Sequence, residues 1–568
     1  MSRAASVIDA IFARAAADPE RLSLVLISPA GNDEVLRSRD VIERSTAHGA
    51  ALAQLGIESG DVVLLALEQR ADLLTSFLGA MLIGAIPCIF PSPTLDFDPT
   101  AYAERLRNAT SKIEPKAVIV ESYSMGSTPP RGYRIIEMDE IESAASAAGD
   151  APRAVSEVAF LQLTSGSTGR QRAVPMKHAA VLASLAALGR AWQIAATDTY
   201  VSWSPLHHAM GLGLVIRPLV FGASAVLIPR LHWLAHPVAL MRAIDRYRGT
   251  IVTMPNFALN YCVQRIADRD MERLDLSSWR ILCAGGEQNR GETLARFAER
   301  FARWGFRRAA LATGYGLTEG GVVTRTTIGR EPRVDRVNRR ALQGRRLALQ
   351  DEGEDAATIV SCGPLVAGVE LQIRSETGTA LPDRNVGEVV VRSDRIFAGY
   401  HGDAEGATES LRDGWLHTGD LGYMAAGELF ICGRLKNIII VGGANVSAED
   451  VEAIAASVER LVAGRVLAFG APTADGQSER VVLVCEFESA IETDRREVEL
   501  ELRRRVKREL DVTLSEVRFV PSGWIAKTSS GKLARSENRS KWDAERIIPE
   551  ASLLLERTAS GGVLTERS

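Results

Sequence analysis

The chain has 568 residues, and its 67 Lys and Arg against 71 Asp and Glu leave a formal net charge of −4. This near balance excludes a nucleic-acid binder that is held by bulk positive charge. With 46% hydrophobic and 24% charged residues, the composition is that of a folded globular protein, and it excludes disorder as the main state.

The cysteines lie far apart and show no C-x-x-C spacing, which predicts neither a zinc site nor a disulfide framework. We therefore expect the reducing environment of the cytoplasm. Two apolar stretches, 73–90 and 205–228, are interrupted by polar residues and prolines. They predict a buried helix that runs into a buried strand, and no membrane span.

Short apolar runs alternate with longer helical patterns along the first half of the chain. The runs expected to form strands are 62–67, 86–90, 117–120 and 225–228, and the clearest helical patterns are 71–83 and 179–191. This alternation predicts a large α/β domain in which parallel strands of mixed sheets are sandwiched by helices.

The character of the sequence changes twice in the second half. Residues 329–357 are rich in charges of both signs and poor in apolar periodicity, as expected of an exposed insertion or a long surface loop. A strand and a glycine pair at 431–443 precede a capped helix at 447–458, a strand at 481–487 and a helix at 495–510. We expect a large domain over 1–433, a small α+β domain over 434–545 and a tail over 546–568.

The helix at 495–510 combines an apolar seam with a basic flank. Val498, Leu502 and Val506 recur every four residues, and Arg504 and Arg505 belong to a cluster of cations beside them. A solvated helix face is the simpler interpretation. A docking surface for an acidic acyl-carrier protein is the alternative hypothesis.

The densest chemical signal is LTSGSTGRQR at 163–172. Glycines let backbone N–H groups turn inward around an anion, while four hydroxyl side chains and Arg172 add donors and a positive charge. This pattern is typical of a phosphate-binding loop, although it lacks the glycine spacing of a Walker loop. A flexible Gly/Ser linker is the alternative for this string by itself.

Three further clusters carry chemistry that suits a nucleotide. ATGYGLTE at 312–319 places an aromatic ring, a hydroxyl and a carboxylate close together, and the carboxylate suits Mg²⁺. HTGD at 417–420 places Asp420 at an expected turn, where it can accept bonds from two ribose hydroxyls. KTSSGK at 527–532 offers a lysine that can neutralise charge on a transferring phosphoryl group.

These motifs, in this order and together with GRLKN at 433–437, resemble those of the adenylate-forming superfamily of acyl-CoA synthetases, adenylation domains and luciferases. Within it the chain most resembles the fatty acyl-AMP ligases, through strings such as SWSPLHHAMG at 202–211 and VSCG at 360–363. The charged segment 329–357 also falls where that subfamily carries an insertion. The resemblance implies a large adenylate-forming domain with a small mobile domain, and an ATP- and Mg²⁺-dependent ligase.

The resemblance also implies a role for each matching residue. The β- and γ-phosphates of ATP are assigned to Thr164, Ser165, Gly166, Ser167, Thr168 and Gly169 with Arg172, the adenine to Gly285, Gly286, Glu287, Tyr315 and Gly316, and the ribose to Asp420 and Arg434. Thr318 is expected to touch the α-phosphate, Glu319 to ligate Mg²⁺, Lys436 to be the hinge within 434–437, and Lys532 to be the catalytic lysine. His208 is expected where the acyl pocket meets the entrance of the carrier arm.

The implied activity is ATP-dependent formation of an acyl-AMP, followed by acyl transfer to the phosphopantetheine thiol of an acyl-carrier protein. Two alternatives stay open, an acyl-CoA ligase that uses free CoA and an inactive homologue that binds nucleotide or acyl-adenylate. The inactive homologue stays open because Arg172-Ala173 and Ala209 depart from the family pattern. The absence of an acidic residue from 204–211 disfavours an amino-acid substrate.

Overall fold

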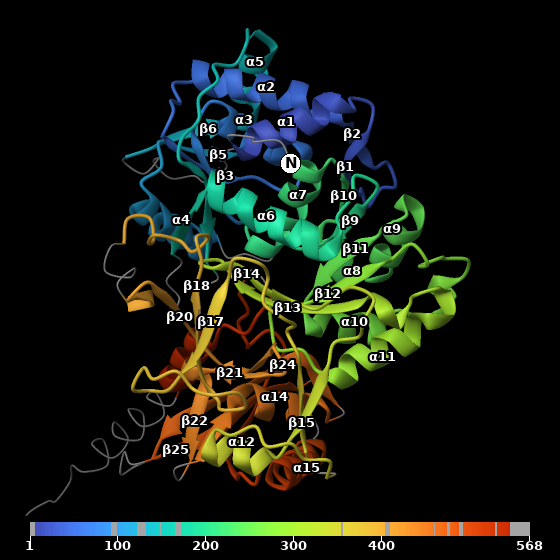
Figure 1. Ribbon diagram of the computed structural model, residues 1–568, viewed down its shortest axis with the longest axis vertical. Coiled ribbons are helices and arrows are strands. Elements are labelled where there is room, and N and C mark those ends of the chain that lie inside the picture. The colour runs from blue at the N-terminus through green and yellow to red at the C-terminus, as the bar shows by residue number, and fades with distance from the viewer. Residues whose placement is uncertain are drawn as a thin grey trace, which may run out of the picture. The chain divides into compact units, whose positions relative to one another are not determined.

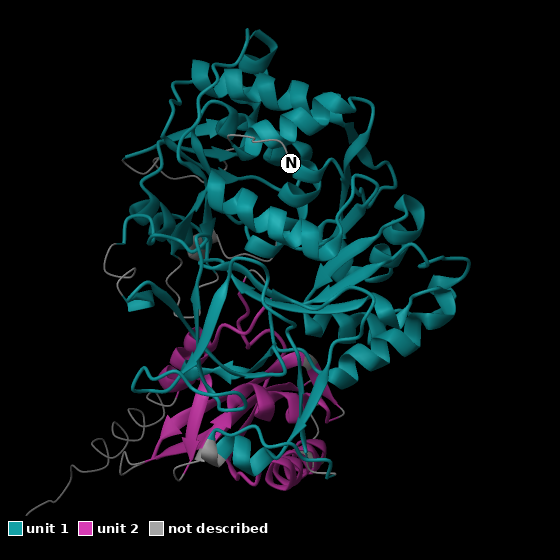
Figure 2. Cartoon of the chain, viewed as in Figure 1, with its two compact units in different colours: residues 1–164, 172–436 teal, residues 165–171, 437–568 magenta. Residues whose placement is uncertain are grey.

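The computed structural model describes residues 6–92, 99–121, 132–147, 149–164, 172–353, 356–403, 409–441, 444–458, 460–473, 478–487, 492–528 and 531–545. Its contacts divide the chain into two compact units (Figure 2). The first unit comprises residues 1–164 and 172–436, and the second comprises residues 165–171 and 437–568. The expected domain limits, with the hinge at 434–437, remain predictions.

One sheet of the first unit has the strand order β14-β13-β12-β11-β9-β10-β1-β2. Its strands are β1 (Leu22–Leu26), β2 (Glu34–Arg37), β9 (Thr199–Ser202), β10 (Ser224–Leu227), β11 (Ile251–Met254), β12 (Ile281–Ala284), β13 (Leu311–Leu317) and β14 (Gly321–Arg325). The inner strands pair in parallel, and β2 and β14 pair antiparallel at the two edges.

A second sheet has the order β6-β5-β3-β4-β7-β8. Its strands are β3 (Val62–Ala66), β4 (Ile86–Ile89), β5 (Ala117–Val120), β6 (Arg134–Glu137), β7 (Val158–Leu163) and β8 (Ala173–Lys177). Only β8, at the edge, is antiparallel to its neighbour among these described strands. The pairing therefore confirms the predicted parallel strands. Their near-continuous apolar runs are buried on both faces, as is usual for parallel strands covered by helices.

Helices cover both faces of these sheets, as the sequence predicted. The layer between the sheets contains α1 (Val7–Ala17), α2 (Ser38–Gln54), α3 (Ala71–Leu82), α5 (Met138–Ala147), α6 (His178–Trp192) and α7 (Ala209–Phe221) (Figure 1). The outer faces are covered by α4 (Pro99–Ile113), α8 (Arg230–Ala235), α9 (Val238–Tyr247), α10 (Asn256–Arg265) and α11 (Gly291–Phe301). Short 3₁₀ turns are η1 (Asp268–Met271), η2 (Ala302–Trp304), η3 (Arg308–Ala310) and η4 (Leu435–Asn437).

The two apolar stretches form buried helix-to-strand units, α3 to β4 and α7 to β10, as predicted. No helix in the described ranges is both long and apolar enough to cross a membrane. None of the six cysteines, all of which the structure describes, forms a disulfide.

The first unit also contains a smaller sheet, in which β17, β18, β20 and β19 lie in that order and β21 pairs with β20. Its strands are β17 (Glu370–Arg374), β18 (Gly387–Arg392), β19 (Leu411–Arg412), β20 (Trp415–Ala425) and β21 (Glu428–Arg434). The charged segment 329–357 precedes this sheet and contains β15 (Val334–Val337) and α12 (Arg339–Arg345), and β15 pairs with β16 (Ala357–Val360). The segment is therefore not a continuous surface loop, because it contains a strand and a helix, while its other expected form, an exposed insertion of the subfamily type, remains a prediction.

Asp335 connects the charged segment to the smaller sheet. Its carboxylate, 5% exposed, accepts hydrogen bonds from Arg384 Nη1 at 3.1 Å and from the Tyr423 hydroxyl at 2.7 Å. Arg384 also donates to the carbonyl oxygen of Ala348 at 2.8 Å. Since a buried carboxylate needs its partners, these bonds hold the charged segment against β20.

The second unit is a small α+β fold. It contains β22 (Ile438–Val441), β23 (Ala444–Ser447), β24 (Leu461–Pro472), β25 (Glu479–Phe487) and β26 (Leu514–Val520), with helices α14 (Ala448–Ala456) and α15 (Glu492–Leu510). Helix α14 follows its N-cap residue Ser447 as predicted, whereas α15 begins three residues before the expected position. The apolar seam Val498, Leu502 and Val506 packs into the core, as its spacing predicted.

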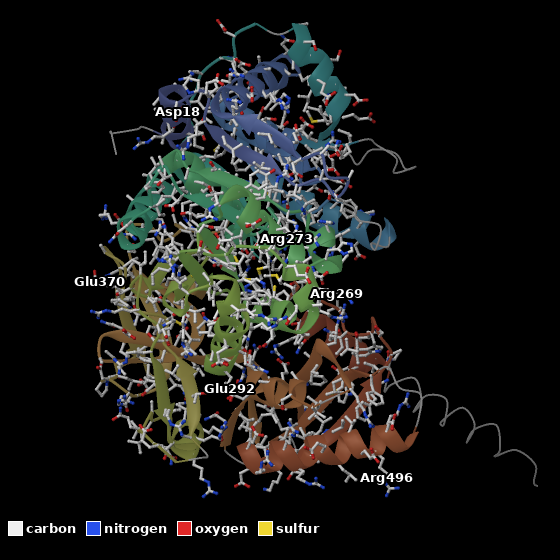
Figure 3. The ribbon with its side chains drawn as sticks, turned by 90° about the vertical axis from the view of Figure 1, so that its right-hand side faces the viewer. Asp18, Arg269, Arg273, Glu292, Glu370 and Arg496 are labelled. Atoms are coloured by element: carbon white, nitrogen blue, oxygen red, sulfur yellow. The ribbon has the colours of Figure 1, made fainter. Side chains whose placement is uncertain are left out.

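The cations of α15 are paired with nearby carboxylates. Arg503 lies 2.6 Å from Glu499, Arg505 lies 2.6 Å from Glu501, and Lys507 lies 2.7 Å from Asp511. The exposed Arg496 lies at the outer side of this helix (Figure 3). Because acidic partners accompany the basic flank, α15 is a mixed-charge face, which favours the solvated-face interpretation over a docking surface.

Candidate functional site

The predicted phosphate loop begins and ends on paired strands of the first unit. Leu163 at the end of β7 is opposite Ala173 at the start of β8, and the Thr164 N–H donates to the Arg172 carbonyl oxygen at 2.8 Å. The Arg172 N–H in turn donates to Thr164 Oγ1 at 3.2 Å. The other loop residues assigned to phosphate, Ser165, Gly166, Ser167, Thr168 and Gly169, lie outside the described residues.

Tyr400 joins Arg172 to Glu319. The Arg172 guanidinium lies 4.9 Å above the Tyr400 ring, and the Tyr400 hydroxyl donates to Glu319 Oε1 at 3.0 Å. Burial, and then the Glu319 carboxylate, raise the pKa of Tyr400, which therefore remains a hydrogen-bond donor at neutral pH. The structure thus brings together the end of the phosphate loop and the carboxylate expected to ligate Mg²⁺.

The residues assigned to adenine lie at the carboxyl ends of parallel strands. Gly285 and Gly286 follow β12, and a Cβ atom on Gly285 would lie 3.5 Å from the Gly314 carbonyl oxygen on β13. Gly286 has φ +86°, a conformation that strains any residue with a side chain, and a Cβ atom there would lie 2.8 Å from Cε at the end of the Met210 side chain. The carboxyl ends of strands are where open α/β sheets bind ligands.

Glu287 follows these glycines in the chain, and His208 is two residues before Met210, which approaches Gly286. Glu287 Oε1 accepts the N–H of Phe257, in the first turn of α10, at 2.5 Å, where the helix dipole favours an anion. His208 is the N-cap residue of α7, and its ring centroid is 4.5 Å from that of His207. The His207 carbonyl oxygen accepts a bond from Gln162 Nε2 at 2.8 Å, which connects this corner to the strand before the phosphate loop.

Tyr315, Asp420 and Arg434 form a compact group. The Tyr315 hydroxyl donates to Asp420 Oδ2 at 2.6 Å, and Arg434 Nε lies 2.7 Å from Asp420 Oδ1. Burial, and then the Asp420 charge, raise the pKa of Tyr315 well above its usual range, so this phenol stays protonated. The carboxylate keeps lone pairs for two more donors.

The expectation that Asp420 lies at a turn is wrong. Asp420 lies within β20, where it pairs with Arg434 on β21. The preceding residues have their own partners, since His417 Nδ1 lies 2.8 Å from Glu388 and the Thr418 hydroxyl donates to the Val389 carbonyl oxygen at 2.7 Å. Glu388 on β18 and the neighbouring sheet therefore fix the backbone that presents Asp420.

The remaining predicted residues are placed as follows. Gly316 is exposed at the end of β13, and Thr318 lies half-buried in the turn that follows, next to Glu319. Lys436 is exposed at the end of the first unit. Lys532 belongs to the second unit, where Thr528 N–H donates to the Lys532 carbonyl oxygen at 2.7 Å across a turn, and the lysine is exposed.

A series of contacts, close approaches and chain neighbours therefore joins several predicted residues of the first unit. It runs from Gln162 through the histidine pair and Met210 to the glycines, and from there to Tyr315 and Asp420. The sequence reasoning missed Tyr400 and Glu388, which position Glu319, Arg172 and the 417–420 segment. Neither belongs to a recognisable motif, and only their tertiary contacts reveal them.

Comparison with known proteins identifies the family. The model of the AMP-binding enzyme family matches residues 11–401. A 4-hydroxyphenylalkanoate adenylyltransferase of Mycobacterium marinum is 31% identical, over 94% of this chain and 89% of the relative. The medium-chain-fatty-acid–[acyl-carrier-protein] ligase JamA of Moorena producens is 30% identical, over 90% of this chain and 91% of the relative.

A solved structure from a study of fatty acyl-adenylate ligases from E. coli and L. pneumophila superposes with a TM-score of 0.88 at 26% identity. The superposition covers 96% of this chain and 98% of that one. This chain therefore belongs to the AMP-binding enzyme family and, as its motifs predicted, is most similar to the fatty acyl-AMP ligases.

Proposed function

We propose that the protein converts a carboxylic acid, in the expected case a fatty acid, into an acyl-adenylate and transfers the acyl group to the phosphopantetheine thiol of an acyl-carrier protein. A carboxylate oxygen attacks the α-phosphorus of ATP, a new oxygen–phosphorus bond forms, and the bond to the β-phosphate breaks to release pyrophosphate. The thiol then attacks the acyl carbon, a thioester forms, AMP leaves, and the thiol proton passes to solvent.

The observation that carries this proposal is the contact series from Gln162 to Asp420. It connects a phosphate-loop end, a glycine wall, an aromatic ring and a buried carboxylate within the first unit. In such reactions the enzyme contributes mainly positioning and charge neutralisation. A glycine- and hydroxyl-rich loop suits the phosphates of ATP, glycines with an aromatic ring suit the adenine, and a buried carboxylate suits the ribose.

The geometry suggests the role of each group. We assign the phosphates to 164–169 with Arg172 and Thr318, the adenine to 285–287 with Tyr315 and Gly316, and the ribose to Asp420 and Arg434. His208 lines the junction between the acyl pocket and the entrance of the carrier arm, Lys436 is the hinge, and Lys532 neutralises charge during adenylation. The likeness to JamA, a named acyl-carrier-protein ligase, favours a carrier protein as acceptor.

Mg²⁺ fits the donor set at Glu319. Mg²⁺ prefers one or two carboxylates together with substrate phosphates and water, and does not require a cage of protein ligands. The described residues hold no cluster of three or more His, Cys, Asp or Glu side chains, in keeping with such an open site. When bound, the ion neutralises phosphate charge.

The substitution Glu319→Gln will raise the Mg²⁺ concentration needed for half-maximal adenylation by at least about tenfold, because the amide lacks the ligand charge. Titration of Mg²⁺ in a pyrophosphate-release assay measures this shift. Tyr400→Phe is the matched control, since it removes the hydrogen bond to Glu319 but keeps the Glu319 carboxylate, and it should give a smaller shift. An unchanged Mg²⁺ curve for Glu319→Gln would remove Glu319 from the metal site.

A pyrophosphate-release screen over acids of graded length tests the activity itself. We expect release that depends on both acid and ATP, and acyl transfer to a carrier protein in preference to free CoA. Transfer to CoA alone would establish the acyl-CoA ligase alternative. Nucleotide binding without pyrophosphate exchange for any acid would establish the inactive homologue.

A further inference from the structure

Two arginines from different elements converge inside the first unit. The guanidinium of Arg217 on α7 lies 5.9 Å from the centroid of the Trp192 ring, and that of Arg325 on β14 lies 5.7 Å from the same ring. Arg217 also lies 6.0 Å from the Tyr200 ring on β9. Burial raises the pKa of the Cys283 thiol on β12, and the charges of Arg325 and Arg217 both oppose this rise, which places both cations near that strand.

This cluster offers hydrogen-bond donors without acceptors. Four buried atoms have no hydrogen-bond partner, namely Nε of Arg217, Nε of Arg325, Nε1 of Trp192 and the hydroxyl of Tyr200. Burial lowers the pKa of Arg217, the neighbouring Tyr200 opposes this shift, and the nearby Arg325 charge adds to it. Four orphaned donors in one interior region point to a missing acceptor, because buried polar groups are ordinarily satisfied.

No carboxylate of the described chain pairs with either arginine. Asp198, two residues before Tyr200, is occupied by Arg280, with Nε and Nη2 at 2.8 and 2.7 Å. Arg325 Nη1 has only backbone acceptors, the carbonyl oxygens of Thr324 at 2.9 Å and of Tyr315 at 3.4 Å. Two neighbouring guanidinium groups, each with a buried Nε atom and neither paired with an anion among the described residues, are costly, which points to an anionic ligand.

The arginine cluster and the proposed adenylation site lie against the same face of α7. Met210, Gly213 and Arg217 follow the i, i+3, i+7 spacing of one helix face, and Met210 approaches Gly286. A Cβ atom on Gly213 would meet only Arg217 Nη2 within 4 Å, at 3.7 Å, so there is room for added atoms immediately beside Gly213. Two helical turns separate Met210 from Arg217, about 10 Å along the axis.

Gly314 connects the cluster to the nucleotide side as well. A Cβ atom on this residue would lie 2.0 Å from Arg325 Nη1, so the arginine crosses the strand where only glycine fits. Gly314 precedes Tyr315, which is assigned to the adenine. Arg325 therefore lies beside the strand that carries Tyr315, and Arg217 lies beside Gly213.

We propose that Arg217 and Arg325 bind a second anionic group, a carboxylate, at the far end of the acid that the enzyme activates. This inference rests on the proposed function and names its substrate class, acids that carry a carboxylate at both ends. Trp192 and Tyr200 supply the remaining donors, and the chain that joins the two carboxylates passes Gly213.

Matched pairs of monocarboxylic and α,ω-dicarboxylic acids, at each chain length from short to long, provide the test in the pyrophosphate-release assay. At the best length we expect kcat/KM for the diacid to exceed that of its monoacid by about 100-fold or more, because a site built for a polar group rejects the analogue that lacks it. Equal or better use of monoacids at every length would overturn the inference and leave the proposed function standing. If no acid of either kind releases pyrophosphate, the proposed function fails, and this inference fails with it.

The substitution Arg217→Met should lower kcat/KM for the diacid by about 100-fold while leaving or improving that for the monoacid. Arg190→Met is the matched control, because Arg190 is exposed on α6 two residues before Trp192. Arg217→Met should melt at the wild-type temperature or above, since it replaces an unpaired buried charge with an apolar side chain. An unchanged diacid-to-monoacid ratio in a folded Arg217→Met would overturn the inference, and Gly213→Leu, which fills the path, provides a second variant that should impair long acids only.

Discussion

Replacing Lys532 with alanine will slow acyl-adenylate formation by roughly 100- to 1,000-fold, the usual cost of removing one group that stabilises transition-state charge. Lys532 is an exposed residue of the second unit, on a turn closed by Thr528. We expect little change in thioester formation when preformed acyl-adenylate is supplied, because the lysine acts on the first step. Pyrophosphate exchange measures the first step, and transfer from isolated acyl-adenylate measures the second.

Two variants separate the position of the lysine from its charge. Lys527→Ala removes the same charge five residues earlier and should leave adenylation within a few-fold of wild type. Lys532→Arg keeps the charge but changes its geometry, so its rate should fall between wild type and alanine. Wild-type pyrophosphate exchange in Lys532→Ala would show that this lysine is not the catalytic one.

The substitution Asp420→Ala is expected to raise the KM for ATP by about 100-fold, because it removes charge-assisted bonds to the ribose worth about 1.5–3 kcal/mol each. It also leaves the Tyr315 hydroxyl without its acceptor, which should lower the free energy of unfolding by about 1–3 kcal/mol. Steady-state kinetics with each substrate varied in turn, together with thermal melts, separate the two effects.

The KM for the acid should stay near its wild-type value in Asp420→Ala, since the carboxylate is assigned to the nucleotide. Tyr315→Phe provides the control, because it deletes one bond to Asp420 and keeps the aromatic ring. Equal rises in both KM values would indicate general disruption of the site and would contradict the ribose assignment.

The sequence predicted the layered part of the fold well because its signals there are local and strong. Runs such as 62–67 and 117–120 are apolar on both faces, as strands between two helical layers must be. The charged segment was harder to predict. In β15 Val337 is fully buried while Val334 is 46% exposed, and such a short amphipathic strand, whose buried Asp335 is paired through distant residues, resembles a loop in sequence.

The candidate site shows the same difference: local motifs could be recognised in the sequence, whereas contacts between distant residues could not. Glycine and hydroxyl motifs marked the parts proposed to bind a nucleotide, and the described contacts join Thr164 to Glu319 through Arg172 and Tyr400, and Tyr315 to Asp420. Tyr400 and Glu388 could not be found from sequence, because they act through partners about 30 to 230 residues away. Arg217 left only a weak signal, a single charge that interrupts the apolar text of α7.

The bonds of Asp335 limit how the charged segment can be altered. Tyr423, which donates to Asp335, is three residues from Asp420 on the same strand. Trimming the segment, or grafting it from a relative as an independent cassette, would release that strand beside the proposed ribose ligand. An engineer who exchanged only this segment would therefore change nucleotide affinity without touching a single nucleotide-binding side chain.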